Sequence, residues 1–374
     1  MNITILGTGF AALTAVKETR KQAPQATITV ISPTKQLVYL PSIIWIPARQ
    51  TRGNDLRVDL TLFFQRQKVT HIEANVENVI NLGRTVITDK GEFHNDGLII
   101  ATGGRFIKKL PGIEYAITPC EGIAAAEAIR DKLDGMLGGT IAIGFGGNPK
   151  EPSAARGGPM FEFLFGIDTL LRRQGRRSKF ELVFFNPAPQ PGKRLGDKVP
   201  KIILKMMAKK GIKTELGHKM KGFEANKIIT EGGEFHADLI LFMPGMTGPA
   251  WLANSELATS EGGLIKANAM CQVEGLEKTY VAGDSGSYPG PDWQAKQAHA
   301  ADLQAATAAR NLMGELHGSV PSETIKHELI CIIDTLSHGV FIKRTEQGTT
   351  LLPPCRLLHF AKKFFEWWYL RQYR

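Results

Sequence analysis

The stretch that decides the fold stands at the start of the chain, where residues 3–12 read ITILGTGFAA. The apolar run Ile3–Leu6 predicts a buried strand, and a glycine turn follows it directly. A helical pattern continues to about Lys21, and a second apolar strand is expected over 27–31. A strand, a glycine turn, a helix and a strand in this order predict a dinucleotide-binding unit. The alternative, a tight turn without a ligand, explains the glycines but not their context.

Each residue type in this turn has a physical role. Gly7 permits the tight turn, Gly9 lets the backbone approach a pyrophosphate, and Ala12 allows the helix to pack closely on the strand. The backbone amides at the start of the helix, at Phe10 and Ala11, then face the phosphate charge. The turn therefore predicts a nucleotide pyrophosphate site.

Three strand ends supply further candidate ligands. An acidic ribose ligand is expected after the second strand, but Ser32 stands there, which weakens any assignment of ribose contacts. Residues 101–104 (ATGG) leave another strand with small side chains, where backbone can pass close to a cofactor. The strand 279–281 ends in Gly283 and Asp284. Open α/β sheets bind ligands at the carboxyl ends of their strands, so Asp284 is expected to face the cofactor.

An internal repeat predicts that the folding unit occurs twice. Residues 84–100 (RTVITDKGEFHNDGLII) align with 226–241 (NKIITEGGEFHADLIL), and a second glycine turn at Gly144 has a similar offset. Each repeat reads as a hairpin followed by an apolar strand of a parallel sheet. We therefore predict an α/β protein with two Rossmann-like dinucleotide-binding domains, the second inserted in the first.

Composition narrows the function classes. The 374 residues suffice for two or three domains, and the net charge of +10 is compatible with an anionic ligand, lipid or nucleic acid. No zinc-finger spacing, RNP motif or basic-helix signature is present, so no nucleic acid partner is expected. The sequence shows no secretory signal and no apolar run of transmembrane length. The four cysteines lack C-x-x-C spacing, and no metal site is predicted.

The C-terminal stretch predicts an amphipathic helix on a membrane surface. Pro353 and Pro354 interrupt the preceding structure, and CRLLHFAKKFFEWWYLRQYR follows. Apolar residues recur at helical spacing, at Leu357, Ala361, Phe364, Phe365, Trp368 and Leu370. The cations Arg356, Lys362, Lys363, Arg371 and Arg374 outnumber Glu366 and suit an anionic membrane. We expect a peripheral membrane protein. The alternative is a terminal helix that packs on its own core or on a second subunit, and a homo-oligomer is compatible with the sequence.

These motifs together resemble the flavoproteins with two dinucleotide-binding domains, in which a glycine turn, ATGG and AGD come in this order. Within that superfamily the chain is similar to the sulfide:quinone oxidoreductase group, through ISPTKQLVYLPSIIWIPAR (31–49), GPMFEF (158–163) and CIID (331–334). The resemblance covers nearly the whole chain. It implies an FAD cofactor contacted by Gly7, Gly9, Phe10, Ala11, Ser32, Thr102, Gly103, Gly283, Asp284 and Lys296. Lys296 is implied to lie near the flavin pyrimidine ring, where a cation stabilises the anionic reduced flavin; the alternative is a solvated lysine.

The same resemblance implies the catalytic residues. Members of the group oxidise sulfide at a cysteine pair on one flavin face and reduce quinone on the other. Cys331 matches one of the pair and Cys120 matches a further cysteine, but Arg156 stands where the partner is expected. A helix start after Cys120 is expected to lower its pKa, and Glu162 is a candidate proton relay. The alternatives are a buried structural role for Cys331 and a helix-start role for Glu162.

The predicted function is therefore an FAD-dependent oxidoreductase of the sulfide:quinone type, which oxidises a small sulfur compound and reduces a membrane quinone. The first alternative is a type II NADH:quinone dehydrogenase, but Pro149 and Pro152 disrupt the helix that would hold NADH at the second glycine turn. The second alternative is a flavin electron carrier without donor chemistry. The expected domains are an FAD-binding domain (1–112 and 247–320), a second dinucleotide-binding-like domain (113–246) and a C-terminal membrane-association region (321–374).

Overall fold

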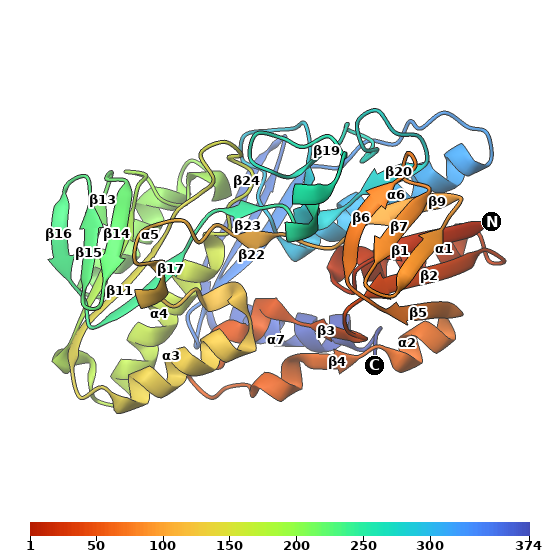
Figure 1. Cartoon of the computed structure of the whole chain (residues 1–374). Helices are drawn as coiled ribbons and strands as arrows, with labels where there is room; N and C mark the ends of the chain where they lie inside the picture. Colours follow the sequence, from red (N-terminus) through yellow and green to blue (C-terminus); the bar gives the residue numbers. More distant parts are fainter.

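The computed structural model describes residues 1–374 and contains two parallel sheets (Figure 1). The first sheet, on the right in Figure 1, has the strand order β20-β9-β1-β2-β5, and all its pairings are parallel. Apolar side chains fill these strands because both faces of such a sheet are covered. The strands are β1 (Asn2–Leu6), β2 (Thr27–Ser32), β5 (Val69–Glu73), β9 (Gly97–Ile100) and β20 (Thr279–Val281).

Two helices pack on each other beside the first sheet. Helix α1 (Phe10–Gln22) begins directly after the glycine turn, as the sequence predicts. Helix α6 (Ala298–Leu316) follows the last strand of the sheet and presents a row of alanines to its neighbours. Small side chains allow the two helices to approach closely, which holds the glycine turn against the carboxyl end of the sheet.

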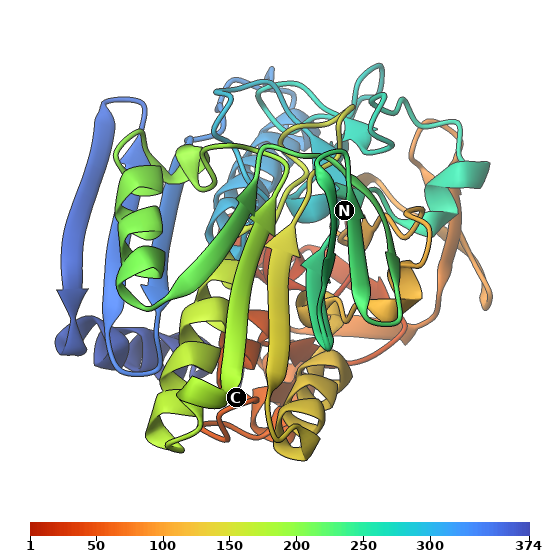
Figure 2. The same cartoon turned by 90° about the vertical axis from the view of Figure 1, so that its left-hand side faces the viewer.

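The second sheet has the order β13-β12-β11-β17, again with parallel pairings only. Figure 2 looks onto this sheet and its helices. The elements are α3 (Ile123–Gly135), β11 (Gly139–Phe145), α4 (Gly158–Arg173), β12 (Phe180–Asn186), α5 (Val199–Lys209), β13 (Ile212–Leu216) and β17 (Leu239–Met243). Strands of the first sheet precede and follow this segment in the sequence. The α/β class and the two Rossmann-type sheets are confirmed.

The internal repeat forms the same structure twice. In the first copy β7 (Thr85–Thr88) and β8 (Gly91–His94) make a hairpin before β9, and in the second β15 (Lys227–Thr230) and β16 (Gly233–His236) precede β17. Matching hydrogen bonds close both hairpins, because Thr88 Oγ1 donates to Gly91 O and Thr230 Oγ1 donates to Gly233 O, each at 2.9 Å. The equivalence of the two halves is therefore confirmed at the level of single side chains.

Shorter elements connect these units. They are β3 (Gln36–Val38), β4 (Arg57–Asp59), α2 (Thr61–Arg66), β6 (Val76–Ile80), β10 (Arg105–Phe106), β14 (Met220–Glu224), β18 (Met246–Thr247), β19 (Ile265–Lys266) and β21 (Gly286–Ser287).

The C-terminal part is an antiparallel sheet followed by a helix. Strands β22 (Glu328–Asp334), β23 (Gly339–Thr345) and β24 (Gly348–Cys355) lie between the two parallel sheets in Figure 1, and α7 (Arg356–Leu370) runs along the bottom of that view. Pro353 and Pro354 lie near the end of β24, an edge strand, where a missing amide donor is tolerated. The pairing of β24 with β23 shifts register at these residues, so the prolines interrupt the ladder as predicted, although the strand runs on to Cys355.

Helix α7 turns its apolar side chains outward. Large apolar residues remain 50–72% exposed: Leu357, Phe360, Phe364, Phe365, Trp367 and Trp368. Polar and tyrosine side chains face the protein instead, and Tyr369 and Tyr373 join the buried cluster around Ile3. The expectation that Leu370 belongs to the exposed face is wrong, because this residue is only 1% exposed in the same cluster. No helix in the structure has both the length and the apolar character needed to cross a bilayer.

Candidate functional site

The first glycine turn leaves an open space at the start of α1. Gly7 has φ +110°, and a Cβ built on it would lie 2.3 Å from the carbonyl oxygen of Ala101, so only glycine fits. A Cβ on Gly9 would meet nothing within 4 Å. No side chain caps the amides of Phe10 and Ala11 at the start of the helix. Open space in front of uncapped amides fits the pyrophosphate of a dinucleotide.

The strand ends converge beside this turn. Ser285 Oγ donates to Gly103 O at 2.9 Å and lies 3.4 Å from Thr102 Oγ1, which joins the ends of β9 and β20. A Cβ on Gly103 would also meet nothing within 4 Å. Gly283 donates its amide to Gln304 Oε1 at 3.0 Å, which fixes the loop that carries Asp284. The predicted residues at 102–103 and 283–284 therefore lie at one edge of the first sheet.

Ser32 has a partner that the sequence did not indicate. Its Oγ lies 2.9 Å from His71 Nε2, on the neighbouring strand β5, and donates to Thr34 O at 2.8 Å. His71 stacks on Phe64 with 5.4 Å between the ring centroids. Burial lowers the pKa of His71 and Lys35 lowers it further, so the ring is neutral at physiological pH. A hydroxyl and an imidazole thus occupy the place of the expected acidic ribose ligand.

Lys296 is buried, which removes the alternative of a solvated lysine. It is 6% exposed, and its Nζ donates to Gly286 O and lies 5.4 Å from the centroid of the Tyr288 ring. Burial lowers the pKa of Lys296 to about 8, against the opposing effects of Asp284 and Glu151. A cation that costs this much to bury is expected at a site where negative charge develops.

The second glycine turn differs from the first. Strand β11 ends at Phe145, but α4 begins only at Gly158, so the loop 146–157 occupies the place of a helix start. This outcome confirms the prediction drawn from Pro149 and Pro152. The loop folds toward the first sheet, where Arg156 forms an ion pair with Asp284.

Both predicted active-site cysteines lie beside the second sheet. Cys331 is partly buried on β22, and its Sγ would be 4.0 Å from a Cβ built on Gly158, two residues beyond Arg156. Cys120 is 5% exposed in the short 3-10 helix before α3. The two thiols are free, and the charges of Glu162 and Lys362 affect the pKa of both: Glu162 raises it and Lys362 lowers it. The structure therefore brings Cys331, Cys120 and Glu162 into one neighbourhood.

The expected low pKa of Cys120 is not found. Burial raises the pKa of Cys120 to about 12, and the opposing effect of Arg156 is smaller. Burial also raises the pKa of Cys331 to about 12. The short 3-10 turn ends before α3 begins, so the cysteine gains no compensating helix charge. Neither thiol is a ready thiolate in the protein alone.

Glu162 belongs to a polar network on the inner face of α7. The network joins Glu162 to Lys362 by an ion pair, and the backbone amide of Asp334 donates to Glu162 Oε1 at 2.8 Å. His359 Nδ1 donates to Asp334 Oδ2 at 2.6 Å, and Trp45 Nε1 donates to Asp334 Oδ1 at 3.2 Å. Burial raises the pKa of Glu162 to about 7, although Lys362 acts in the opposite direction.

This network corrects two sequence expectations. The sequence groups Lys362 with the lipid-facing cations, but its side chain is 14% exposed and forms an ion pair with Glu162. Glu162 lies within α4 rather than capping it, so a helix-start role does not explain the residue. Asp334 and His359 were not predicted. The spacing of His359, Lys362 and Glu366 along one helix face is the signal that could have found them.

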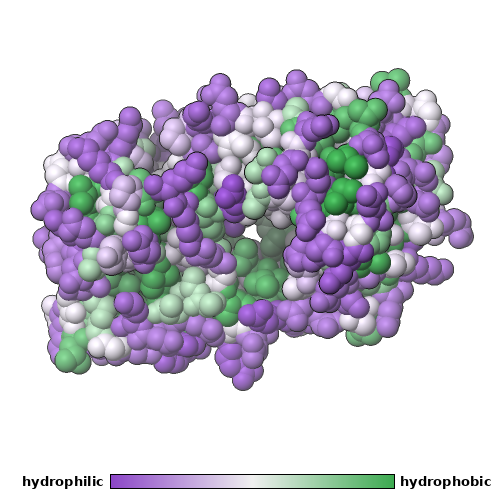
Figure 3. Space-filling view, in the orientation of Figure 1, coloured by the Kyte–Doolittle hydropathy of each residue, from purple (hydrophilic) through white to green (hydrophobic).

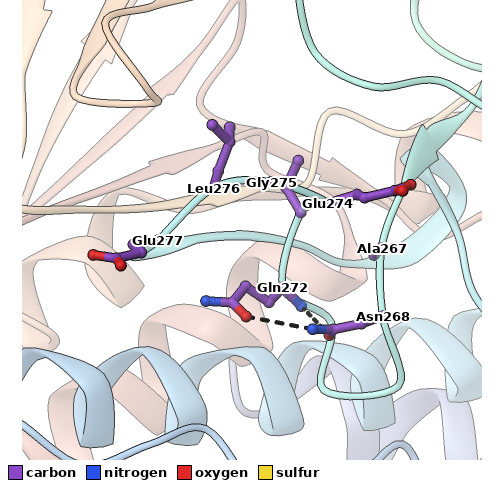
Figure 4. Close-up of a pocket in the computed structure, with 8 residues that line it drawn as sticks. Ala267, Asn268, Gln272, Glu274, Gly275, Leu276 and Glu277 are labelled. Carbon is purple, nitrogen blue, oxygen red and sulfur yellow. Dashed lines mark hydrogen bonds between the residues drawn. The ribbon is translucent and has the colours of Figure 1, made fainter.

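The surface between the two sheets is hollowed. Figure 3 shows a depression between the two halves of the molecule, with hydrophobic residues inside and below it and hydrophilic residues at its sides. A separate surface pocket of about 480 Å³ is lined by residues between Ala267 and Glu277 (Figure 4). Its lining includes Asn268, whose amide donates to Gln272 Oε1 at 3.3 Å. The residues that line this pocket precede the amino end of β20 in the sequence. Open parallel sheets bind ligands at the carboxyl ends of their strands, so we assign this pocket no function.

Two Rossmann-type sheets, an open glycine turn and a buried lysine at the strand ends define a nucleotide-dependent oxidoreductase. The family model described as pyridine nucleotide-disulphide oxidoreductase matches residues 1–305. The chain belongs to this family, and it is an FAD-dependent oxidoreductase. The open space at Gly9 and Gly103 fits this cofactor.

Known relatives differ in their donors. A type II NADH:quinone oxidoreductase from Staphylococcus saprophyticus is 22% identical over 308 residues, covering 76% of this chain and 74% of the relative. The sulfide:quinone oxidoreductase of Aquifex aeolicus has a TM-score of 0.90 at 20% identity, covering 100% of this chain and 91% of that one. A NAD-dependent persulfide reductase from A. fulgidus has a TM-score of 0.69 at 18% identity, covering 93% and 65%. The structural similarities show a common fold.

Proposed function

We propose that the protein oxidises a small sulfur donor and reduces a membrane quinone, as an enzyme of the sulfide:quinone oxidoreductase type. The observation that carries the proposal is the orientation of α7. Its outer face is apolar and exposed, while its inner face contacts Glu162 through Lys362. One helix thus has an apolar surface suited to lipid on one side and contacts a buried proton-binding group on the other. A lipophilic quinone must leave the bilayer and take up protons when it is reduced, so both features are needed close together.

The residues divide the work between two half-reactions. Bound FAD supplies the two-electron redox chemistry. On the donor side, Cys331 is the candidate residue that would bind the donor sulfur as a persulfide, and the two electrons released when that S–S bond forms would pass to FAD. Its contact region near Gly158 adjoins the loop that carries Arg156. On the quinone side, burial raises the pKa of Glu162 to about 7. Glu162 Oε1 accepts from the Asp334 amide and from Lys362, so Oε2 is the oxygen that can hold a proton at neutral pH and exchange it with a quinone. Lys362 positions that carboxylate.

The type II NADH:quinone dehydrogenase remains the second candidate because one relative bears that name. The loop 146–157 argues against it. Nicotinamide nucleotides bind where a helix start follows the glycine turn, and here that helix starts at Gly158. Asn148 fastens the loop by donating to Met246 O and Gly262 O at 2.9 and 3.0 Å. The loop therefore supports a non-nicotinamide donor.

The donor is tested by mixing the purified holoprotein anaerobically with sulfide and, in a separate sample, with NADH, while flavin absorbance is followed. We expect sulfide to bleach the flavin within seconds and NADH to leave it oxidised. Addition of a short-chain quinone should then restore the absorbance. Bleaching by NADH with no response to millimolar sulfide would make the protein a type II dehydrogenase. No response to either donor would support a flavin carrier that depends on another reductant.

Membrane attachment gives a second expected result. Replacing Phe364, Trp367 and Trp368 together by serine should lower the fraction bound to anionic phospholipid vesicles at least about tenfold, because each aromatic side chain contributes apolar burial in the interface. Vesicle sedimentation measures the effect. High salt should weaken binding only in part, since the cations Arg356 and Arg371 supply a screened contribution.

The matched control replaces two apolar residues that lie elsewhere and are even more exposed, Leu137 and Val320, at 86% and 85%. Their serine variants should bind vesicles as the wild type does. Deleting α7 is a poorer test, because Tyr369 and Tyr373 belong to the core of the first sheet. Unchanged sedimentation of the triple variant would place the lipid contact elsewhere.

A further inference from the structure

The loop 146–157 is built into the edge of the first sheet. Beyond the contacts of Asn148, Glu151 accepts a hydrogen bond from Ser287 at 2.8 Å, and the amide of Met246 donates to Ala154 O at 2.9 Å. A Cβ on Gly262 would lie 2.2 Å from the Cβ of Glu151, so the loop sits directly on the backbone there. These contacts hold the loop in one position and carry its last side chains to the ends of β9 and β20.

These contacts place Arg156 in a cluster of charged side chains at the carboxyl ends of β9 and β20, where the cofactor is expected to bind. It pairs with Asp284, and the two side chains are 16% and 17% exposed. The charges of Arg156, Asp284 and Glu151 act on Lys296: the two carboxylates raise its pKa and Arg156 lowers it. The cluster therefore contains two cations and two carboxylates in a partly buried position, where charge interactions are weakly screened.

We infer that Arg156 sets the reduction potential of the flavin, as a fixed cation that Asp284 and the loop 146–157 hold at the cofactor edge of the first sheet. The inference rests on the FAD cofactor and not on the proposed donor or quinone. Reduced flavin carries a negative charge at neutral pH, so a fixed cation nearby favours the reduced form. Without the Arg156 cation, Lys296 is the one positive charge beside the carboxylates of Asp284 and Glu151, so the site disfavours the anionic reduced flavin.

The alternative is that Arg156 only ties the loop to the sheet. Three substitutions separate charge from attachment. Arg156→Gln removes the cation, Arg156→Lys keeps it, and Asn148→Ala loosens the loop without changing any charge. Glu151→Gln removes an anion from the same cluster and should therefore act in the opposite direction to Arg156→Gln.

The experiment is an anaerobic redox titration of each holoprotein against a reference dye. We expect Arg156→Gln to weaken the preference for reduced over oxidised flavin about tenfold to a hundredfold, which is about 30 to 60 mV for a two-electron couple. Arg156→Lys should stay near the wild type, and Glu151→Gln should raise the potential. Asn148→Ala should lower the potential less than Arg156→Gln does, because Asp284 still holds the cation. Equal potentials for Arg156→Gln and wild type, or an equal fall in Asn148→Ala, would overturn the inference. If Arg156→Gln does not retain FAD, a failure of Glu151→Gln to raise the potential would overturn it.

The pH dependence of the potential gives an independent signature. Lys296 faces Asp284, Glu151, Arg156, the Tyr288 ring and Gly286 O. Burial and, less strongly, Arg156 lower the pKa of Lys296 to about 8, against the opposing effects of Asp284 and Glu151. The potential should therefore show a break near pH 8 in the wild type, because the lysine loses its charge above that pH. In Arg156→Gln the break should move to higher pH, and a break at an unchanged pH would contradict the placement of the cation.

Discussion

Gly9→Val is expected to yield a folded protein that has lost its flavin, with occupancy below about a tenth of the wild-type value. Gly9 has φ −79°, which any residue adopts, and a Cβ there meets no protein atom within 4 Å. The added methyl groups therefore enter only the space in front of α1, where the pyrophosphate must approach the backbone. Absorbance of the purified protein at the flavin band measures occupancy.

A thermal melt separates lost binding from lost folding. A ligand present at a thousand times its Kd stabilises by about 4 kcal/mol, so wild-type protein should melt higher with FAD than without it. Gly9→Val should melt like the wild-type apoprotein in both conditions. Gly135→Val is the matched control, because Gly135 ends α3 and a Cβ there also meets nothing. Full flavin occupancy in Gly9→Val would remove the glycine turn from the FAD site.

Cys331→Ser is expected to slow flavin reduction by sulfide at least about a thousandfold while FAD stays bound. Cys331 carries the only thiol on β22, and a serine hydroxyl cannot form the corresponding bond to sulfur with comparable ease. The two side chains have nearly the same size, so packing beside Gly158 is retained. Anaerobic stopped-flow absorbance measures the rate, and the flavin-to-protein ratio shows that the site is intact.

Cys355→Ser serves as the control for the thiol, since Cys355 is exposed at the start of α7 and contacts the amide of Leu357 only locally. Its rate should equal that of the wild type. A Cys331→Ser protein that sulfide still reduces at the normal rate would leave Cys331 a packing residue. Cys120 would then be the remaining thiol in this neighbourhood.

Much of the fold could be predicted because local signals and the repeat agree. Gly91 and Gly233 both occupy hairpin turns at positive φ, and each hairpin leads into a buried parallel strand. Repeated turn chemistry fixes local geometry without reference to the rest of the chain. The place of Asp284 just after β20 could also be predicted, because the apolar run 279–281 marks the strand and Gly283 marks its end.

The contacts across the molecule could not be predicted in this way. The apolar spacing of α7 indicates an amphipathic helix but does not say which face the protein covers. Spacing alone therefore places Lys362 and Leu370 on the lipid side, whereas both lie against the protein. The Ser32–His71 contact depends on the register of β2 and β5. Arg156 reaches Asp284 across 128 positions because of how the loop 146–157 folds. Such contacts arise from tertiary packing, which no local pattern encodes.

The burial of Tyr369 and Tyr373 in the cluster that begins at Ile3 has a consequence for biogenesis. The ribosome makes β1 first, yet the hydrophobic core around it closes only after residue 373 has been synthesised. At roughly 10 residues per second, the nascent first sheet waits about half a minute for its last side chains. The core that supports the first glycine turn is therefore complete only after this last part of the chain has been made. During that interval the incomplete sheet is a natural client for chaperones.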